Sequence, residues 1–168
     1  MGRHGFRSSQ QRSHQMTELT IHSDEHFMRQ ALNQAKLAYE EKEIPIGAIV
    51  VSEKRIVARA HNQVERLDDA TAHAEMLALT AAQNHLNSKY LNDCTLYVTL
   101  EPCTMCAGAL FWTQIGRIVI GARDDKRGFD RLKPDVIHPT TKVEFGLLSQ
   151  ECKEMIKDFF KEMRRNNF

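Results

Sequence analysis

The folded part of the chain opens with apolar residues spaced as on one face of a helix. Four of them recur at intervals of three or four residues: Met28, Leu32, Ala35 and Tyr39. Ser23 precedes them and is followed by two acidic residues, and serine is a favoured N-cap. The pattern therefore predicts a helix that begins near Ser23 and turns one apolar stripe toward the core.

Short β-prone runs follow, and they predict five strands. Gly47–Val51 and Ile56–Ala60 flank the polar residues 52–55, which is typical of a hairpin. The other strands are predicted at Leu96–Leu100, Arg117–Ala122 and, with a weaker pattern, Lys142–Phe145.

Three further helices are predicted between and after these strands. They run from Thr71, as N-cap, to Asn84, from Thr104 to Thr113, and from Ser149 to Arg165. The last of them has an apolar side made of Cys152, Met155, Ile156, Phe159 and Met163. A hairpin followed by alternating strands and helices predicts an α/β sandwich with a mixed sheet.

Length and charge set the domain organisation. The 168 residues, 42% hydrophobic and 27% charged, fit one globular domain, which we place at residues 21–168. Residues 1–20 are predicted to form a disordered basic extension, because residues 1–16 contain Arg3, Arg7 and Arg12 but no acidic residue. An unstructured tail and an RNA-binding arm both fit it. The net charge of +1 does not decide nucleic-acid binding, so an RNA contact requires a local basic patch.

The four cysteines do not resemble the disulfide framework of a secreted protein. The N-terminus lacks the apolar core of a signal peptide, and no apolar run is long enough to span a membrane. We therefore expect a reducing, cytoplasmic setting without membrane contact. Thiols stay available for metal binding under those conditions.

Two short motifs predict a metal site. Residues 71–75 read Thr-Ala-His-Ala-Glu, and residues 102–106 read Pro-Cys-Thr-Met-Cys. His73, Cys103 and Cys106 offer one imidazole and two thiolates, which are three of the four ligands of a tetrahedral zinc ion. The fourth position is then open to water, as in catalytic zinc sites.

Glu75 is not needed as a ligand, so it is available to move protons. Zinc lowers the pKa of its bound water, and a neighbouring carboxylate can take a proton from that water, pass it to a ring nitrogen and later protonate a leaving amine. These parts suit hydrolytic deamination of an amidine-like carbon in a nucleobase. His73 and Glu75 lie roughly 200° apart on a regular helix, so the metal is expected off the helix end.

Each of these residues also has a simpler interpretation. Cys-x-x-Cys alone fits a redox pair or half of a zinc knuckle. The redox pair leaves His73 and Glu75 unexplained, and the knuckle requires a fourth ligand, for which Cys94 is the nearby candidate. Cys94 stands just before a strand and Cys152 on an apolar helix side, so both are expected in the core. A silent zinc or RNA-binding module remains an alternative, against which the retained Glu75 argues.

The combined motifs and their surroundings resemble the cytidine-deaminase-like zinc deaminases, and among them the bacterial tRNA-specific adenosine deaminases. The resemblance runs from about Asp24 to Arg165. It is densest in residues 43–48 (Glu-Ile-Pro-Ile-Gly-Ala), 60–62 (Ala-His-Asn), 71–75 and 95–109, where Thr-Leu-Tyr-Val-Thr-Leu-Glu-Pro-Cys is the most specific run. It implies a three-layer α/β/α sandwich with a mixed five-stranded sheet.

The resemblance also implies roles for single residues. His73, Cys103 and Cys106 would hold one zinc ion per subunit of a homodimer, with Glu75 as proton shuttle. Asn62 would lie against the target nucleoside, although it also fits a turn after a strand, and the backbone N–H of Ala74 would help read the base edge. The implied substrate is the wobble adenosine of a tRNA anticodon loop, converted to inosine.

RNA contacts are less firmly indicated, and one segment departs from the family. Asp124 and Lys126 match family positions near the anticodon loop, and a last group of cations lies on the C-terminal helix: Lys161, Arg164 and Arg165. The departure lies in residues 127–135, where Arg127 could bind an RNA phosphate and Phe129 could stack on a base. The same sequence fits an ordinary charged loop equally well. This divergent segment leaves open a deaminase of a free base or nucleoside, of the guanine or cytosine type.

Overall fold

The computed structural model describes residues 21–132 and 136–166, so the predicted extension at residues 1–20 lies outside the described residues. Five strands form one sheet: β1 (Gly47–Ser52), β2 (Arg55–His61), β3 (Cys94–Leu100), β4 (Arg117–Ala122) and β5 (Lys142–Phe145). Their spatial order is β2-β1-β3-β4-β5. β1 runs antiparallel to β2 and β3, whereas β3, β4 and β5 are parallel, so the sheet is mixed as predicted.

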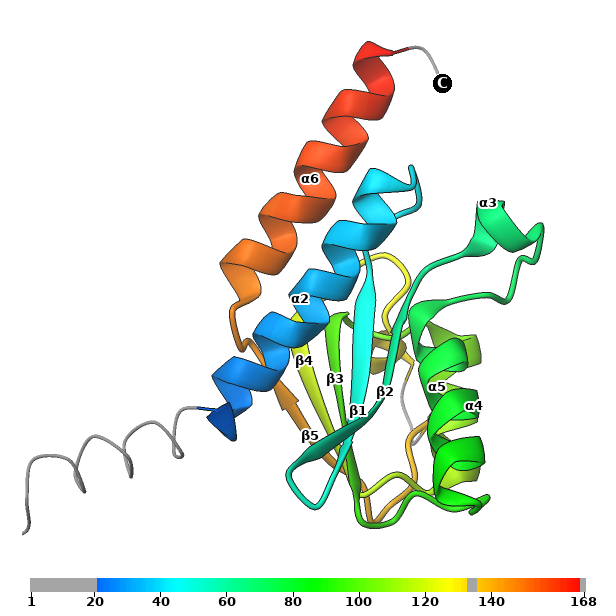
Figure 1. Ribbon diagram of the computed structural model, residues 1–168. Helices are drawn as coiled ribbons and strands as arrows, with labels where there is room; N and C mark the ends of the chain where they lie inside the picture. The colour runs from blue at the N-terminus through cyan, green and yellow to red at the C-terminus, as the bar shows by residue number, and fades with distance from the viewer. Residues whose placement is uncertain (1–20, 133–135, 167–168) are drawn as a thin grey trace, which may run out of the picture.

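Helices cover both faces of the sheet (Figure 1). α2 (Asp24–Glu40) and α6 (Ser149–Arg165) lie on one face, and α4 (Ala74–Leu86) and α5 (Thr104–Thr113) on the other. A four-residue helix, α3 (Val64–Leu67), and a short 3₁₀ turn, η1 (Phe129–Arg131), complete the described elements. The expected three-layer sandwich is therefore confirmed. None of the helices in the described ranges is long and apolar enough to cross a membrane.

The apolar stripe predicted on the first helix is confirmed at three of its four positions. Met28, Leu32 and Ala35 of α2 are buried, whereas Tyr39 is half-buried. Ser23 caps the helix by accepting the N–H of His26 at 3.1 Å. α2 approaches β1 so closely that a Cβ at Gly47 would lie 2.0 Å from the carbonyl oxygen of Ala31. This contact requires glycine at the start of β1 and fixes that helix against the sheet.

The parallel strands bring the metal motifs to one end of the sheet. β3 and β4 are nearly continuous buried apolar runs, as expected for strands covered on both faces. The chain leaves the carboxyl end of β3 at Leu100, passes Cys103 and enters α5, and α4 lies beside α5 on the same face. Ligands in open α/β sheets bind at this end of parallel strands.

Candidate active site

His73, Cys103 and Cys106 converge at the carboxyl end of β3. Their ligand atoms all lie within 4.8 Å of one another. The Nδ1 atom of His73 is 3.6 Å from the Sγ atom of Cys103 and 3.6 Å from that of Cys106. A tetrahedral zinc ion with ordinary Zn–N and Zn–S bonds separates such atoms by about 3.6 Å. The donor set and its spacing therefore fit zinc without rearrangement.

Two of these residues occupy the N-cap positions of helices. His73 caps α4 and Cys103 caps α5, both with extended backbone, and neither side chain makes a capping hydrogen bond. N-caps are usually Ser, Thr, Asp or Asn, which bond back to the helix. Here the side chains instead point past the helix ends toward each other. The predicted start of α4, with Thr71 as N-cap and His73 in the first turn, was therefore wrong by two residues.

Asn62 replaces the missing cap of α4. Its Oδ1 atom accepts the backbone N–H of Ala74 at 2.8 Å, and its side chain is only 4% exposed. The hydrogen bond fixes the orientation of the Asn62 amide, so its Nδ2 group remains as a donor. Ala74 N–H and Asn62 are thus paired with each other in this structure, which joins the end of β2 to the start of α4.

Glu75 is the second residue of α4 and is buried. Its Oε2 atom lies 3.2 Å from the Sγ atom of Cys106. Burial raises the pKa of Glu75 above its ordinary value, because the charged form loses its hydration. A carboxyl group with a raised pKa beside the ligand cluster is suited to accept and return protons.

The thiols respond to the same environment in opposite ways. Hydrogen bonds from Cys106 and His73 lower the pKa of Cys103 to about 4, which favours its thiolate form. The pKa of Cys106 is raised, first by the neighbouring Cys103 and then by burial. The thiolate is the form of cysteine that binds a metal.

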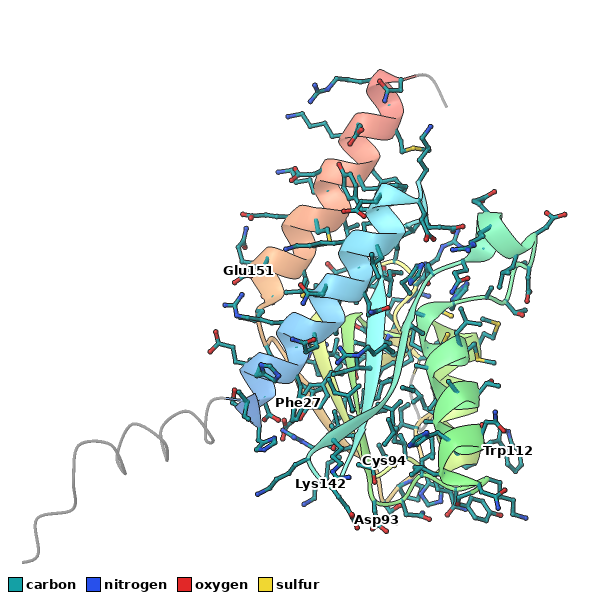
Figure 2. All side chains as sticks on the ribbon, in the orientation of Figure 1. Phe27, Asp93, Cys94, Trp112, Lys142 and Glu151 are labelled. Atoms are coloured by element: carbon teal, nitrogen blue, oxygen red, sulfur yellow. The ribbon has the colours of Figure 1, made fainter. Side chains whose placement is uncertain are left out.

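Cys94 and Cys152 belong to the core, as predicted. Cys94 is 3% exposed and Cys152 is 2% exposed, and all four cysteines are free. Cys94 begins β3, whereas Cys103 follows its carboxyl end, so the length of the strand separates them by about 20 Å. Figure 2 places Cys94 toward the end of the sheet opposite the start of α4. A closed site with Cys94 as fourth ligand is therefore incompatible with the fold.

Two buried glutamates that the sequence analysis did not single out hold loops beside the site. Glu43 is 2% exposed and accepts the N–H groups of Glu65 at 3.2 Å and Arg66 at 2.7 Å. It thereby anchors α3, which lies between Asn62 and His73. Glu101, 4% exposed, similarly receives backbone N–H groups from residues 124 and 130. The available signal was an acid inside two of the four stretches where the family resemblance is densest, residues 43–48 and 95–109.

The suggested RNA contacts separate into exposed and buried residues. Lys126 and Arg127 are exposed and Asp124 is half-buried, and Asp124 accepts the N–H groups of the other two at 3.0 Å. Phe129 is only 6% exposed and packs on Phe145, with ring centroids 6.2 Å apart. The idea that Phe129 offers a stacking surface is corrected by this burial, because its ring already belongs to the core. Residues 133–135 lie outside the described part.

The three cations of the last helix are exposed. Lys161, Arg164 and Arg165 all lie in the final turns of α6. Figure 1 shows the C-terminal end of α6 projecting beyond the sheet, on the face opposite α4 and α5. These side chains are accessible to solvent, and their contact with RNA stays a prediction.

Comparisons with known proteins identify the family of the chain. A family model described as MafB19-like deaminase matches residues 22–164. The tRNA-specific adenosine deaminase of Aquifex aeolicus is 46% identical over 147 residues, covering 84% of this chain and 97% of the relative. The enzyme of the same name from Bacillus subtilis is 42% identical, covering 84% and 91%.

Two solved structures of deaminases are similar to the chain over most of its length. A structure from a study of A-to-I editing by tRNA:A34 deaminases matches with a TM-score of 0.73 and 40% identity, over 77% of this chain and 98% of that chain. A guanine deaminase from Nitrosomonas europaea matches with a TM-score of 0.69 and 26% identity, over 82% and 84%. By its likeness over most of its length, the chain belongs to the tRNA-specific adenosine deaminase family, hydrolytic enzymes of the cytidine-deaminase-like superfamily.

Proposed function

We propose that this protein hydrolytically deaminates the wobble adenosine of a tRNA anticodon loop to inosine, with one zinc ion per subunit. The observation that carries the proposal is the open three-ligand cluster with a buried carboxylate 3.2 Å from one of its thiols. A closed structural site would need a fourth protein ligand. The relatives that span the whole folded part are named for the tRNA reaction, which supports RNA as the substrate.

His73, Cys103 and Cys106 would hold the metal. When bound there, zinc supplies Lewis-acid chemistry and makes hydroxide available from water near neutral pH. Glu75 takes the proton from the attacking water and delivers it to the ring nitrogen next to the reacting carbon of adenine. It then takes the second proton from the hydroxyl group newly formed on that carbon and transfers it to the exocyclic amine, which leaves as ammonia, so the product keeps the oxygen of water as its carbonyl.

Asn62 and Ala74 would orient the base for this attack. The Asn62 amide is held by its bond to the Ala74 N–H, so its free Nδ2 group is presented in a fixed direction. An enzyme that acts on a base in RNA reads that base outside the stack, which suits an anticodon loop with splayed bases. Exposed cations would bind phosphates of the RNA: Lys126 and Arg127 in the segment attached to Cys103, and Lys161, Arg164 and Arg165 at the end of α6.

A second candidate is deamination of a free base. It is favoured by the likeness to a guanine deaminase at 26% identity and by the divergent segment 127–135. The two candidates share the metal ligands and Glu75 and differ in what surrounds the base. The lead is preferred because the tRNA-specific relatives are more similar over a comparable share of the chain.

A direct comparison of substrates tests this proposal. The zinc-loaded protein is incubated with an anticodon stem-loop carrying adenosine at the wobble position, and separately with guanine, cytosine and adenosine. We expect inosine in the stem-loop and no ammonia from the free compounds. The Glu75→Ala variant should retain zinc and lose turnover. Activity confined to a free base would reject the lead, and turnover by the Glu75 variant would reject the mechanism.

We also propose that the protein acts as a homodimer through the α4–α5 layer. Trp112 of α5 is 77% exposed, and Figure 2 shows it projecting outward from this layer. The outer side of α4 carries an open groove of about 860 Å³ lined by residues that include Leu77 and Ala81. A large exposed aromatic residue is typical of an interface, and so is an open groove lined partly by apolar residues in the same layer. Trp112→Glu should halve the mass measured by light scattering, whereas an unchanged mass would place the interface elsewhere.

A further inference from the structure

Glu101 is a buried acid that the proposed chemistry does not use. It stands between the end of β3 and Pro102, two residues before the ligand Cys103. Both of its carboxylate oxygens are occupied by main-chain donors. Oε1 accepts the N–H of Asp124 at 3.3 Å, and Oε2 accepts the N–H of Asp130 at 3.0 Å.

The segment 124–131, here the 124–131 loop, is folded around this carboxylate. A Cβ at Gly128 would lie 1.9 Å from the Oε2 atom of Glu101 and 2.6 Å from the carbonyl oxygen of Asp124, so only glycine fits there. Gly128 also pairs antiparallel with Cys103, and the N–H of Phe129 donates to Pro102 at 3.0 Å. The loop is therefore attached to the segment that carries a metal ligand.

We propose that Glu101 is a positioning residue that fixes the 124–131 loop against the metal-binding segment, so that Lys126 and Arg127 meet the substrate at a set distance from the reacting base. This role rests on the proposed function for the identity of the substrate. A surface loop of this length is ordinarily mobile, and ordering it on binding lowers affinity. A buried carboxylate with two backbone donors removes that mobility before the substrate arrives.

The other side of the site has the same arrangement, which supports a positioning role. Glu43, equally buried, holds α3 through two backbone N–H groups next to Asn62. Glu43 precedes β1 and Glu101 follows β3, and each carboxylate accepts two backbone N–H groups of one segment beside the site. Neither carboxylate belongs to the ligand cluster. Both loops that flank the ligands are thus fixed by buried acids.

Glu101→Gln in the zinc-loaded protein tests the role of the carboxylate. Glutamine keeps the size but has one acceptor oxygen, so one of the two backbone N–H groups then faces an NH₂ group. Hydrogen exchange should become faster in the 124–131 loop and stay unchanged in α4, with full zinc content. Unchanged exchange in the loop would overturn the proposal, and loss of zinc would assign Glu101 to metal binding instead.

Binding of the anticodon stem-loop tests the consequence for the substrate. These measurements use the Glu75→Ala background, which prevents turnover. There, Glu101→Gln should weaken binding of the stem-loop about 5- to 10-fold. It should also reduce the slope of log Kd against log salt concentration by about 1 or 2, because ordered phosphate contacts are lost. In the active protein KM should rise while kcat changes less than about 3-fold. A fall in kcat with unchanged KM would overturn the positioning role.

A double-mutant cycle separates positioning from general destabilisation. Lys126→Gln removes one cation from an intact loop, and its effect should be smaller when Glu101→Gln is already present, because the loop no longer presents that side chain. Strictly additive effects would contradict this. Asp24→Asn is the stability control. Asp24 lies in α2, outside the loop, and its carboxylate binds Tyr97 of β3 and Arg117 of β4. This variant should be less stable but should leave RNA affinity unchanged.

Gly128→Ala perturbs the same contact from the side of the loop, and it is the variant to use if Glu101→Gln does not fold. Its added methyl group forces the loop away from the carboxylate while Glu101 stays intact, and it should reproduce the faster exchange and the weaker binding. If the unsubstituted protein does not bind the stem-loop, the proposed function fails. The exchange measurement and the KM for a free base then decide whether Glu101 positions the loop.

Discussion

Replacing Phe129 by alanine distinguishes a core residue from a base-stacking residue. The side chain is 94% removed from solvent and lies against Phe145 in the cluster between the sheet and the α4–α5 layer. A buried phenylalanine removes on the order of 200 Å² from water, which at about 25 cal/mol per Å² gives an upper bound near 5 kcal/mol. Measured Phe→Ala changes in cores run about 3–5 kcal/mol. We expect a loss of about 3–4 kcal/mol.

The assay is denaturant unfolding at saturating zinc, supported by thermal unfolding. For a chain of this length about 1 kcal/mol lowers Tm by about 2–4 °C, so Phe129→Ala should lower Tm by about 10 °C. Phe160→Ala is the matched control, because Phe160 is 41% exposed on α6 and should cost about 1 kcal/mol or less. A Phe129 variant no less stable than the control, but with weaker RNA binding, would refute the burial argument and restore the stacking role.

Three further predictions concern the site and the fold. Burial raises the folded-state pKa of Glu75, so its charge destabilises the folded protein above the ordinary pKa of 4.5. At pH 7, metal-free Glu75→Gln should therefore unfold at a higher denaturant concentration than the metal-free wild type, and this difference should disappear below pH 4.5. A difference in stability that does not depend on pH would contradict this. Cys94→Ser should retain zinc in elemental analysis and Cys103→Ser should lose it; zinc loss by the former would reopen the closed-site alternative. Gly47→Ala should cost about 1–3 kcal/mol in denaturant unfolding, because its Cβ meets the Ala31 carbonyl at 2.0 Å, and unchanged stability would contradict that packing.

The regular elements could be predicted because their sequence patterns are local. Thr104–Thr113, Arg117–Ala122 and Lys142–Phe145 have the bounds expected from propensity and periodicity. α3 was missed, since its four residues have no apolar period and no side-chain cap. It is held instead by Glu43, twenty or more residues earlier in the chain. Elements that depend on a distant partner leave no periodic pattern in their own sequence.

The metal ligands could be predicted because the chemistry restricts which residue types can serve. One imidazole and two thiolates at motif spacing have few other uses, and the structure brings all three together. The start of α4 was misplaced because Thr71 is a better N-cap than His73 by propensity alone. The ligand role of His73 and the external cap from Asn62 outweigh that preference. A propensity rule fails here at a position where the side chain serves the metal.

Phe129 illustrates a different limit. Beside Arg127 and within a charged segment, an aromatic residue fits both RNA stacking and core packing, and only tertiary contacts decide between them. The buried carboxylate of Glu101 accepts two backbone N–H groups of the same segment. The 124–131 loop, which carries the exposed cations, is therefore anchored by a buried aromatic ring and a buried carboxylate. The metal ligands are set by the starts of α4 and α5, whereas the loops around them are set by acids from elsewhere in the chain. A substitution in such a loop can therefore change substrate preference while the metal site keeps its geometry.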